Sequence, residues 1–194
     1  MATRFRGLLP VVIDIETTGL DPATDGLLEI AAVPLRMDAS GKLHPLSPAF
    51  YPIDPHPEAR IDPAALQVTG IDPDSALRGA IPEHQALHRL FTVVRSWLEA
   101  SRCQRAVLVG HNAWFDLAFL RAATKRSALE PMPFHSFTTI DTASLAAVFL
   151  GETVLARALR AAGIGFDVQQ AHSAVYDAVK TAKLFCHMAN GWDF

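Results

Sequence analysis

The chain has few cysteines and no long apolar run, and each shortage excludes a class of protein. Two cysteines among 194 residues cannot build a disulfide framework or a thiolate metal cluster. The apolar run near the N-terminus is too short for a signal peptide, and no segment approaches the roughly 20 apolar residues that a membrane span needs. We therefore expect a soluble, cytoplasmic protein without a membrane partner.

Positive charge is not in excess either. The chain has 17 basic and 20 acidic residues, a net charge of −3, which argues weakly against a nucleic-acid binder when net charge alone is considered. Half of the residues are hydrophobic, so the chain can bury one sizeable core. We expect a single domain over residues 1–194.

Hydrophobic periodicity predicts a group of strands followed by alternating helices and strands. Short apolar segments rich in β-branched residues indicate strands, and apolar residues at i, i+3 and i+4 indicate helices. Residues 54–82 are rich in Pro, Asp and Gly and predict a long loop with one short helix at 63–70. The predicted strands are 10–17, 27–37, 50–53, 105–110 and 137–141, and the other predicted helices are 83–101, 111–126, 142–150, 153–162 and 173–190. This order predicts an α/β fold with a mixed sheet of about five strands flanked by helices, and Asn112 is the expected N-cap of the helix at 111–126.

Carboxylates occur in apolar surroundings at three separate places. In "VVIDIETTGL", Asp14 and Glu16 share one face of a strand, because residues i and i+2 point to the same side. Asp116 lies one turn into the helix "HNAWFDLAFL", and Asp177 lies on an otherwise apolar helix, five residues after His172. Bare carboxylates in such surroundings repel one another and take up a proton. Mg²⁺ or Mn²⁺ would remove this conflict, because both cations prefer oxygen ligands.

Each of these residues also has a structural explanation. Asp14 could cap a turn, and Asp116 could accept a hydrogen bond from its own helix. Asp177 could pair with Lys180, and a single histidine is more often structural than catalytic. The functional interpretation is favoured because three segments share the same feature. Near a metal site, His172 could take a proton from an attacking water.

The segments "DIETTG", "HNAWFDLAFL" and "HSAVYDAVKTAKLF" resemble, in this order, the three motifs of the DEDDh exonucleases. The resemblance implies a ribonuclease H-like fold, two Mg²⁺ ions per active site and stepwise removal of nucleotides from 3′ ends. It also implies that His172 is the catalytic base and a member of the metal site. The metal ligands that it implies are Asp14, Glu16, Asp116, His172 and Asp177.

Further segments, among them "LLEIAA", "GIDPD", "PFHSF" and "DTASLA", resemble the ribonuclease T group of this family. That group trims the 3′ ends of tRNA and other stable RNAs and also acts on single-stranded DNA. Four phenylalanines grip the terminal bases in this group, and only two of them are matched here, so we expect a changed preference for the terminal base. Ala64 stands where the group carries an acid. The substrate-binding residues predicted near the acids are Thr17, Leu20, Val68, Phe115 and Phe137, where Leu20 and Val68 replace aromatic rings and Phe115 could equally be a core residue.

The resemblance also implies a homodimer. In the ribonuclease T group, a basic patch on one subunit guides RNA into the active site of the partner. Arg4, Arg6 and Arg105 match this patch, whereas Glu99 and Glu130 stand where lysines are expected, which predicts a weaker patch.

Three other functions stay open at this point. A DEDDh proofreading exonuclease acting on DNA shares the motifs, but not the resemblance at 20–80 and 132–150. A hydrolase of oligoribonucleotides is compatible with the fold. A catalytically silent nucleic-acid-binding module would be expected to lose an acid, and this chain keeps all four. The sequence favours a Mg²⁺-dependent 3′–5′ exoribonuclease.

Overall fold

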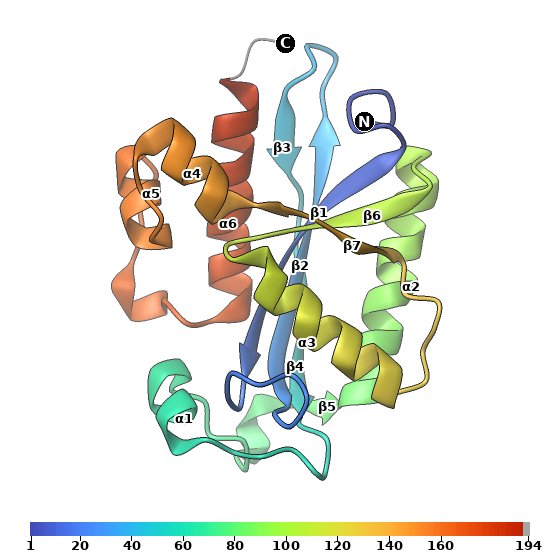
Figure 1. Ribbon diagram of the computed structural model, residues 1–194, viewed down its shortest axis with the longest axis vertical. Coiled ribbons are helices and arrows are strands. Elements are labelled where there is room, and N and C mark those ends of the chain that lie inside the picture. Colours follow the sequence, from blue (N-terminus) through green and yellow to red (C-terminus); the bar gives the residue numbers. More distant parts are fainter. Residues whose placement is uncertain (192–194) are drawn as a thin grey trace.

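The computed structural model describes residues 1–191, and a seven-stranded mixed sheet forms its centre (Figure 1). The strands are β1 (Leu8–Thr17), β2 (Leu27–Met37), β3 (Leu43–Pro45), β4 (Ala49–Asp54), β5 (Ile81–Pro82), β6 (Arg105–Gly110) and β7 (Phe134–Asp141). Their order in the sheet is β5-β4-β2-β1-β6-β7, and β3 pairs with β2 off this path. The five predicted strands are present. The two additional strands, β3 and β5, are three and two residues long, which is too short for a hydrophobic period to reveal them.

The predicted helices are present as well. They are α1 (Pro63–Thr69), α2 (Glu83–Ser101), α3 (Ala113–Arg126), α4 (Thr142–Leu150), α5 (Leu155–Ala161) and α6 (Ala174–Asn190), with 3₁₀ helices η1 (Ala76–Arg78) and η2 (Val168–Gln170). Of the predicted single domain, residues 192–194 lie outside the described part. Among residues 1–191, no single helix is long and apolar enough to cross a membrane; α4 and α5 meet the length and composition criteria only as a bent pair.

Strand β1 is buried on both faces. Its residues Leu9, Val11 and Ile13 pack into a core shared with α2 and α3. On the other face, Val12 packs with β2 and α6, and a smaller cluster joins α4, α5 and α6. Figure 1 shows α2 and α3 on one side of the molecule and α4, α5 and α6 on the other. Because β1 is apolar on both faces, the acids at its end stand out from their surroundings.

The sheet opens at the carboxyl end of β1. β1 runs parallel to β6, but their pairing ends at Val12↔Val109, whereas β1 stays paired with antiparallel β2 as far as Thr17. Beyond Val12, one edge of β1 therefore has no strand from residues 1–191 beside it. Helix α3 starts directly after β6 and lies next to this open edge.

The start of α3 corrects one expectation. Asn112 occupies the N-cap position with a left-handed backbone (φ 66°), but its side chain makes no capping hydrogen bond. Instead, Asp141 Oδ1 accepts from the backbone N–H groups of Asn112 (2.8 Å) and Ala113 (3.4 Å). The same carboxylate accepts from Ala143 and Ser144 at the start of α4. The predicted N-cap position is confirmed, but Asp141 supplies the capping bonds, because β6 and β7 run in parallel with Gly110 paired to Asp141, so the end of β7 lies beside the start of α3.

Candidate functional site

The four acids come from three elements that meet at the open end of β1. Asp14 and Glu16 lie on β1, Asp116 on the first turns of α3 and Asp177 on the first turns of α6. Glu16, Asp116 and Asp177 are only 8%, 5% and 8% exposed. Ligand atoms of Glu16, His172 and Asp177 lie within 4.8 Å of one another. The structure therefore brings together the residues that the sequence predicts as metal ligands.

Local hydrogen bonds hold two of these carboxylates in place. Asp116 accepts from the backbone N–H of Ile15, on the edge of β1 that has no neighbouring strand. Asp177 Oδ2 accepts from the backbone N–H of His172 at 2.9 Å. The other oxygen, Asp177 Oδ1, is buried and has no hydrogen-bond partner. A buried, unpartnered carboxylate oxygen among other carboxylates is a ligand position for a cation.

Electrostatics support the same conclusion. Burial raises the pKa of Glu16 to about 8, and repulsion from Asp177, Glu29 and Asp116 adds to the effect. Burial likewise raises the pKa of Asp116 to about 8 and the pKa of Asp14 well above its ordinary value. Carboxyl groups with such pKa values hold protons near neutral pH unless a cation compensates them. Four acids with this geometry fit hard divalent cations such as Mg²⁺ or Mn²⁺.

These pKa values predict an unusual pH dependence of stability for the metal-free chain. Glu16 and Asp116 bind protons in the folded chain up to about pH 8, but in the unfolded chain only up to about pH 4. Their contribution to the free energy of unfolding is therefore present below about pH 4 and is lost as the pH rises toward 8. In EDTA, the melting temperature should fall between pH 5 and pH 8, by about 2–4 °C for each kcal/mol lost. Adding Mg²⁺ should raise it more at pH 8 than at pH 5, and an equal rise at both values would contradict the shifted pKa values.

Glu29 is a neighbouring acid that the sequence analysis missed. It lies opposite Glu16 in the β1–β2 ladder and accepts from the backbone N–H of Ala174 at 3.1 Å. His172 has a left-handed backbone (φ 64°) just before α6. Asp177 and Glu29 thus hold the backbone of this turn at His172 and at Ala174. The available signal was an acid inside the apolar segment "LLEIAAV".

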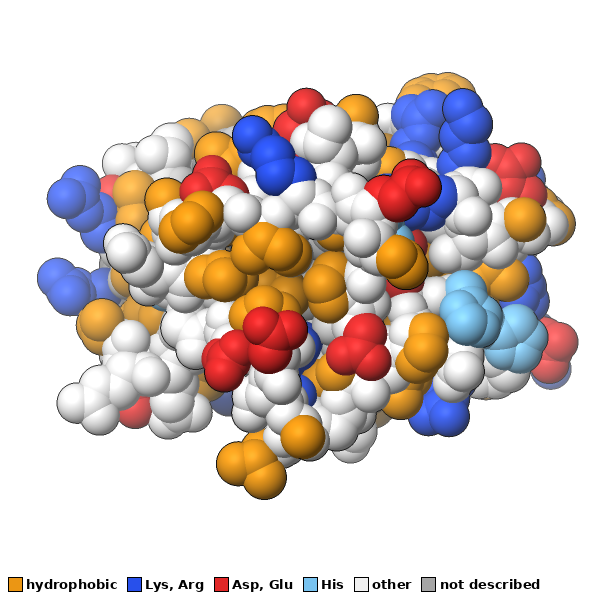
Figure 2. Space-filling view, turned by 90° about the horizontal axis from the view of Figure 1, so that it is seen from below, with side chains coloured by type: hydrophobic (Ala, Val, Ile, Leu, Met, Phe, Trp, Pro, Cys, Tyr) orange, Lys and Arg blue, Asp and Glu red, His pale blue; other side chains and the backbone are white. Residues whose placement is uncertain are grey.

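A hollow of about 300 Å³ lies beside the acids. Glu16 and four of the five predicted substrate-binding residues line it: Thr17, Leu20, Val68 and Phe115. Figure 2 shows hydrophobic side chains at the centre of the face that carries α1 and the end of β1, with Lys and Arg mainly toward its edges. Phe137, the fifth residue, does not line this hollow. It is 77% exposed on β7, with its ring against that of His135.

The glycine of "DIETTG" shapes the rim of the hollow. A Cβ atom on Gly19 would lie 2.0 Å from Asp25 Oδ2. Asp25 is fully buried, pairs with Arg60 and accepts from the backbone N–H of Asp21. Only glycine allows the chain to pass this close to Asp25, and the turn leaves Leu20 79% exposed at the rim.

The predicted basic residues lie away from the acids. Arg6 and Arg105 are exposed where β1 and β6 begin, at the opposite end of these strands from Asp14 and Glu16. Arg105 lines a hollow of about 430 Å³ together with Arg121 and Lys125. Arg4 has a structural contact: its guanidinium donates to the carbonyl oxygens of Gly41 (2.7 Å) and Ala189 (2.6 Å).

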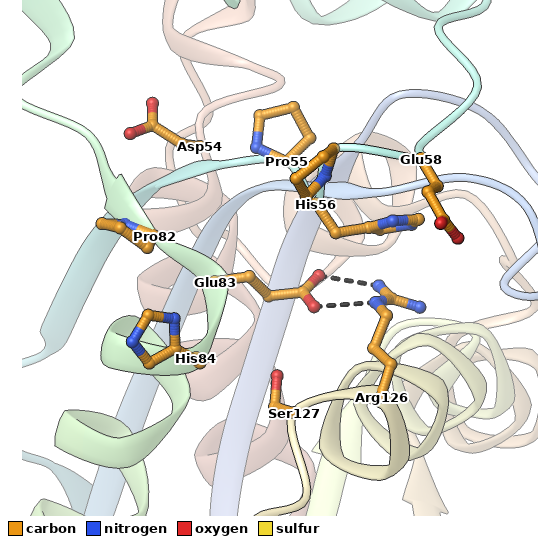
Figure 3. A pocket seen from close by; sticks show the side chains of 10 residues that line it. Asp54, Pro55, His56, Glu58, Pro82, Glu83, His84, Arg126 and Ser127 are labelled. Carbon is orange, nitrogen blue, oxygen red and sulfur yellow. Dashed lines mark hydrogen bonds and ion pairs between the residues drawn. The ribbon is translucent and has the colours of Figure 1, made fainter.

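A hollow of about 580 Å³ lies away from the acids. Figure 3 shows it between the segment after β4, the start of α2 and the end of α3. Arg126 donates to both carboxylate oxygens of buried Glu83, each at 2.7 Å. This ion pair joins α2 to α3, and none of the four clustered acids lines the hollow.

Comparison with known proteins places this geometry in a family. Residues 11–185 match the family model RNase_T, described as exonuclease. Ribonuclease T of Photorhabdus laumondii is 52% identical over 192 residues, which cover 99% of this chain and 88% of that protein. Ribonuclease T of Escherichia coli K12 is 50% identical over 192 residues, 99% of this chain and 89% of that protein.

A solved structure agrees at the level of the fold. Exonuclease I of E. coli, in complex with a dT13 oligonucleotide, superposes with a TM-score of 0.70 at 22% identity, covering 92% of this chain and 40% of that chain. The predicted α/β exonuclease fold is thereby confirmed. With half of its residues identical to those relatives along nearly its whole length, the chain belongs to the ribonuclease T family of exonucleases.

Proposed function

We propose that this chain is a Mg²⁺-dependent 3′–5′ exoribonuclease that trims the 3′ ends of tRNA and other stable RNAs and also degrades single-stranded DNA. We place it in the cytoplasm and assign its activity to one domain over residues 1–194. The observation that carries the proposal is the meeting of four acids and His172 beside a hollow that has an apolar rim. The relatives named ribonuclease T support an RNA substrate.

The residues of the site have three proposed roles: metal binding, proton transfer and positioning. Asp14, Glu16, Asp116 and Asp177 would hold two Mg²⁺ ions, with Mn²⁺ as an alternative, and His172 lies close enough to join them. When bound, such ions activate water and neutralise charge on the leaving oxygen. The exposed ring of His172 takes the proton of the attacking water. Glu29 and Asp177 hold the turn that carries this ring.

A degradation assay tests the proposal. The protein is incubated with a 5′-labelled tRNA that has a 3′ overhang and with single-stranded DNA of equal length, in Mg²⁺, Mn²⁺ or EDTA. We expect a ladder that shortens one nucleotide at a time from the 3′ end in either metal, and no products in EDTA. Internal cuts, or intact RNA in the presence of Mg²⁺, would contradict the proposal. Much faster degradation of DNA than of RNA would favour the proofreading alternative.

Phe115→Ala should weaken single-strand binding, because Phe115 lines the hollow next to Glu16. A ring that stacks on a base contributes roughly 1–3 kcal/mol, which is about 5–150-fold in Kd. Binding of a labelled oligonucleotide in EDTA measures this loss. Phe115→Tyr, which keeps the ring, is the matched control. A lower melting temperature with unchanged affinity would identify Phe115 as a core residue only.

The proposed enzyme is a homodimer in which each active site uses the basic residues of the partner. The argument is distance: Arg6 and Arg105 lie at the start of β1 and β6, whereas Asp14 and Glu16 lie toward the end of β1. The rise of about 3.3 Å per strand residue separates Leu8 from Glu16 by roughly 26 Å. A second subunit could bring its arginines to the RNA that enters the first site.

Mixing two inactive variants tests the shared site. One variant is Asp177→Asn, and the other is Arg6→Ala with Arg105→Ala. Arg4 is left intact because its guanidinium contacts the main chain. Half of randomly mixed dimers are mixed, and one of their two sites is complete, so about a quarter of wild-type activity should return. No recovery despite proven subunit exchange, or a monomer in sedimentation, would exclude the shared-site model.

A further inference from the structure

Trp114 does not line the hollow itself but precedes Phe115, which does, and its position is not explained by burial. It is the second residue of α3, 68% exposed, and directly precedes Phe115 and Asp116. An indole ring in the core stabilises the fold by leaving water, and Trp114 gains little of that. Single exposed apolar residues are common and need no explanation. Trp114 differs because its ring is in contact with that of Phe115, which in turn contacts a buried ring.

A row of three aromatic rings runs from the core to the surface along α3. Phe119 is fully buried, and its ring centroid lies 4.9 Å from that of half-buried Phe115. The Trp114 ring meets Phe115 edge-on, with centroids 5.8 Å apart and planes at 87°. The buried end of the row anchors the exposed end. Trp114 therefore presents an aromatic surface with restricted motion at the edge of the site.

The order of side chains around α3 relates this surface to the substrate. Successive helical residues are turned by about 100°, so Trp114 points about 100° away from Phe115 and about 160° away from Asp116. Asp116 is at the metal site, and Phe115 lines the hollow. A base in contact with Trp114 is therefore one step farther from the acids than a base on Phe115. Because a 3′ end has no continuation on its 3′ side, such a base must lie upstream, on the 5′ side.

We propose that Trp114 forms a stacking subsite for an upstream base of the substrate strand, beyond the nucleotides held at the hollow. This inference rests on the proposed nuclease function. The subsite adds aromatic surface at a hollow whose rim includes the aliphatic Leu20 and Val68, which have no π-face for a base. Stacking of this kind accepts any base, so Trp114 affects the affinity for single strands rather than the preference for a sequence.

Binding of a length series tests the subsite. Kd values are measured in EDTA for 5′-labelled single strands of two, three, four and six nucleotides, with wild type, Trp114→Ala, Trp114→Phe, Trp114→Leu and Phe115→Ala. We expect Trp114→Ala to weaken binding of the longer strands about 5–150-fold, the range for one stacked base. The dinucleotide should be nearly unaffected. Trp114→Phe should retain most of the affinity, and Trp114→Leu should not.

Two outcomes of the binding series would overturn the subsite. They are an equal loss at every length, and unchanged binding in Trp114→Ala while Phe115→Ala binds weakly. In the second case the proposed function stands and only the subsite fails. If wild type binds no single strand, the proposed function fails with it. Sedimentation of Trp114→Ala gives the last check, because a shift to monomer would show Trp114 to be an interface residue instead.

Discussion

Asp14→Asn should abolish cleavage and at the same time stabilise the metal-free chain. The Asp14 carboxyl lies among Asp116, Glu16 and Asp177, and burial and these neighbours raise its pKa. The amide removes one negative charge from the metal site, and turnover should fall on the order of 10³–10⁴-fold, the scale for losing a charged group that stabilises the transition state. In EDTA near neutral pH, the unfolded chain has an ionised Asp14 that must take up a proton on folding, and the amide removes this cost, so the melting temperature should rise.

Turnover and the melting temperature in EDTA together show whether Asp14 is a metal ligand or an acid with a structural role. Loss of a structural hydrogen bond would lower the melting temperature, whereas loss of a bare ligand raises it in EDTA. Added Mg²⁺ should stabilise wild type more than the variant. Glu58→Gln, at an exposed acid beside the hollow of about 580 Å³, is the matched control and should change neither activity nor the response to Mg²⁺. Near wild-type rates for Asp14→Asn in Mg²⁺ would exclude the two-metal assignment.

The clustering of the four acids could be predicted because each acid interrupts a pattern that has a clear physical meaning. An apolar strand with acids at i and i+2 has to present both on one face, and the structure shows Asp14 and Glu16 there. Asp116 and Asp177 interrupt apolar helices in the same way. The strand and helix order also followed from periodicity, because each predicted element is long enough to show one.

The remaining features depend on contacts between segments that are distant in sequence. Asp141 caps α3 only because parallel pairing places the end of β7 beside the end of β6. Glu29 reaches Ala174 across 145 residues. Arg4 donates to the carbonyl oxygen of Ala189, 185 residues away. This contact gives Arg4 a structural role that its match to the predicted basic patch does not reveal. No local pattern encodes these pairs.

Replacing His172 should reduce turnover while leaving RNA binding intact. The ring is exposed and within reach of Glu16 and Asp177, and its backbone is left-handed at φ 64°. A positioned base contributes about 10²–10⁴-fold to the rate, so kcat should fall by that factor. His172→Asn is the sharper variant, because asparagine tolerates the left-handed conformation better than alanine and its amide is not a base. His172→Ala should show the same loss of rate, with a lower melting temperature from the strained backbone.

Separate measurements of binding and turnover decide between a base and a positioning residue. The Kd for a labelled RNA in EDTA should stay within about twofold of wild type, since no stacking or phosphate contact is lost. Single-turnover rates with saturating enzyme should carry the entire defect. Glu29→Gln is the comparison: it keeps an acceptor for Ala174 N–H, so the turn is preserved and the rate should change far less. If His172→Asn instead bound RNA poorly and turned over normally once saturated, His172 would be a substrate contact, and the proton of the attacking water would have to go to another group.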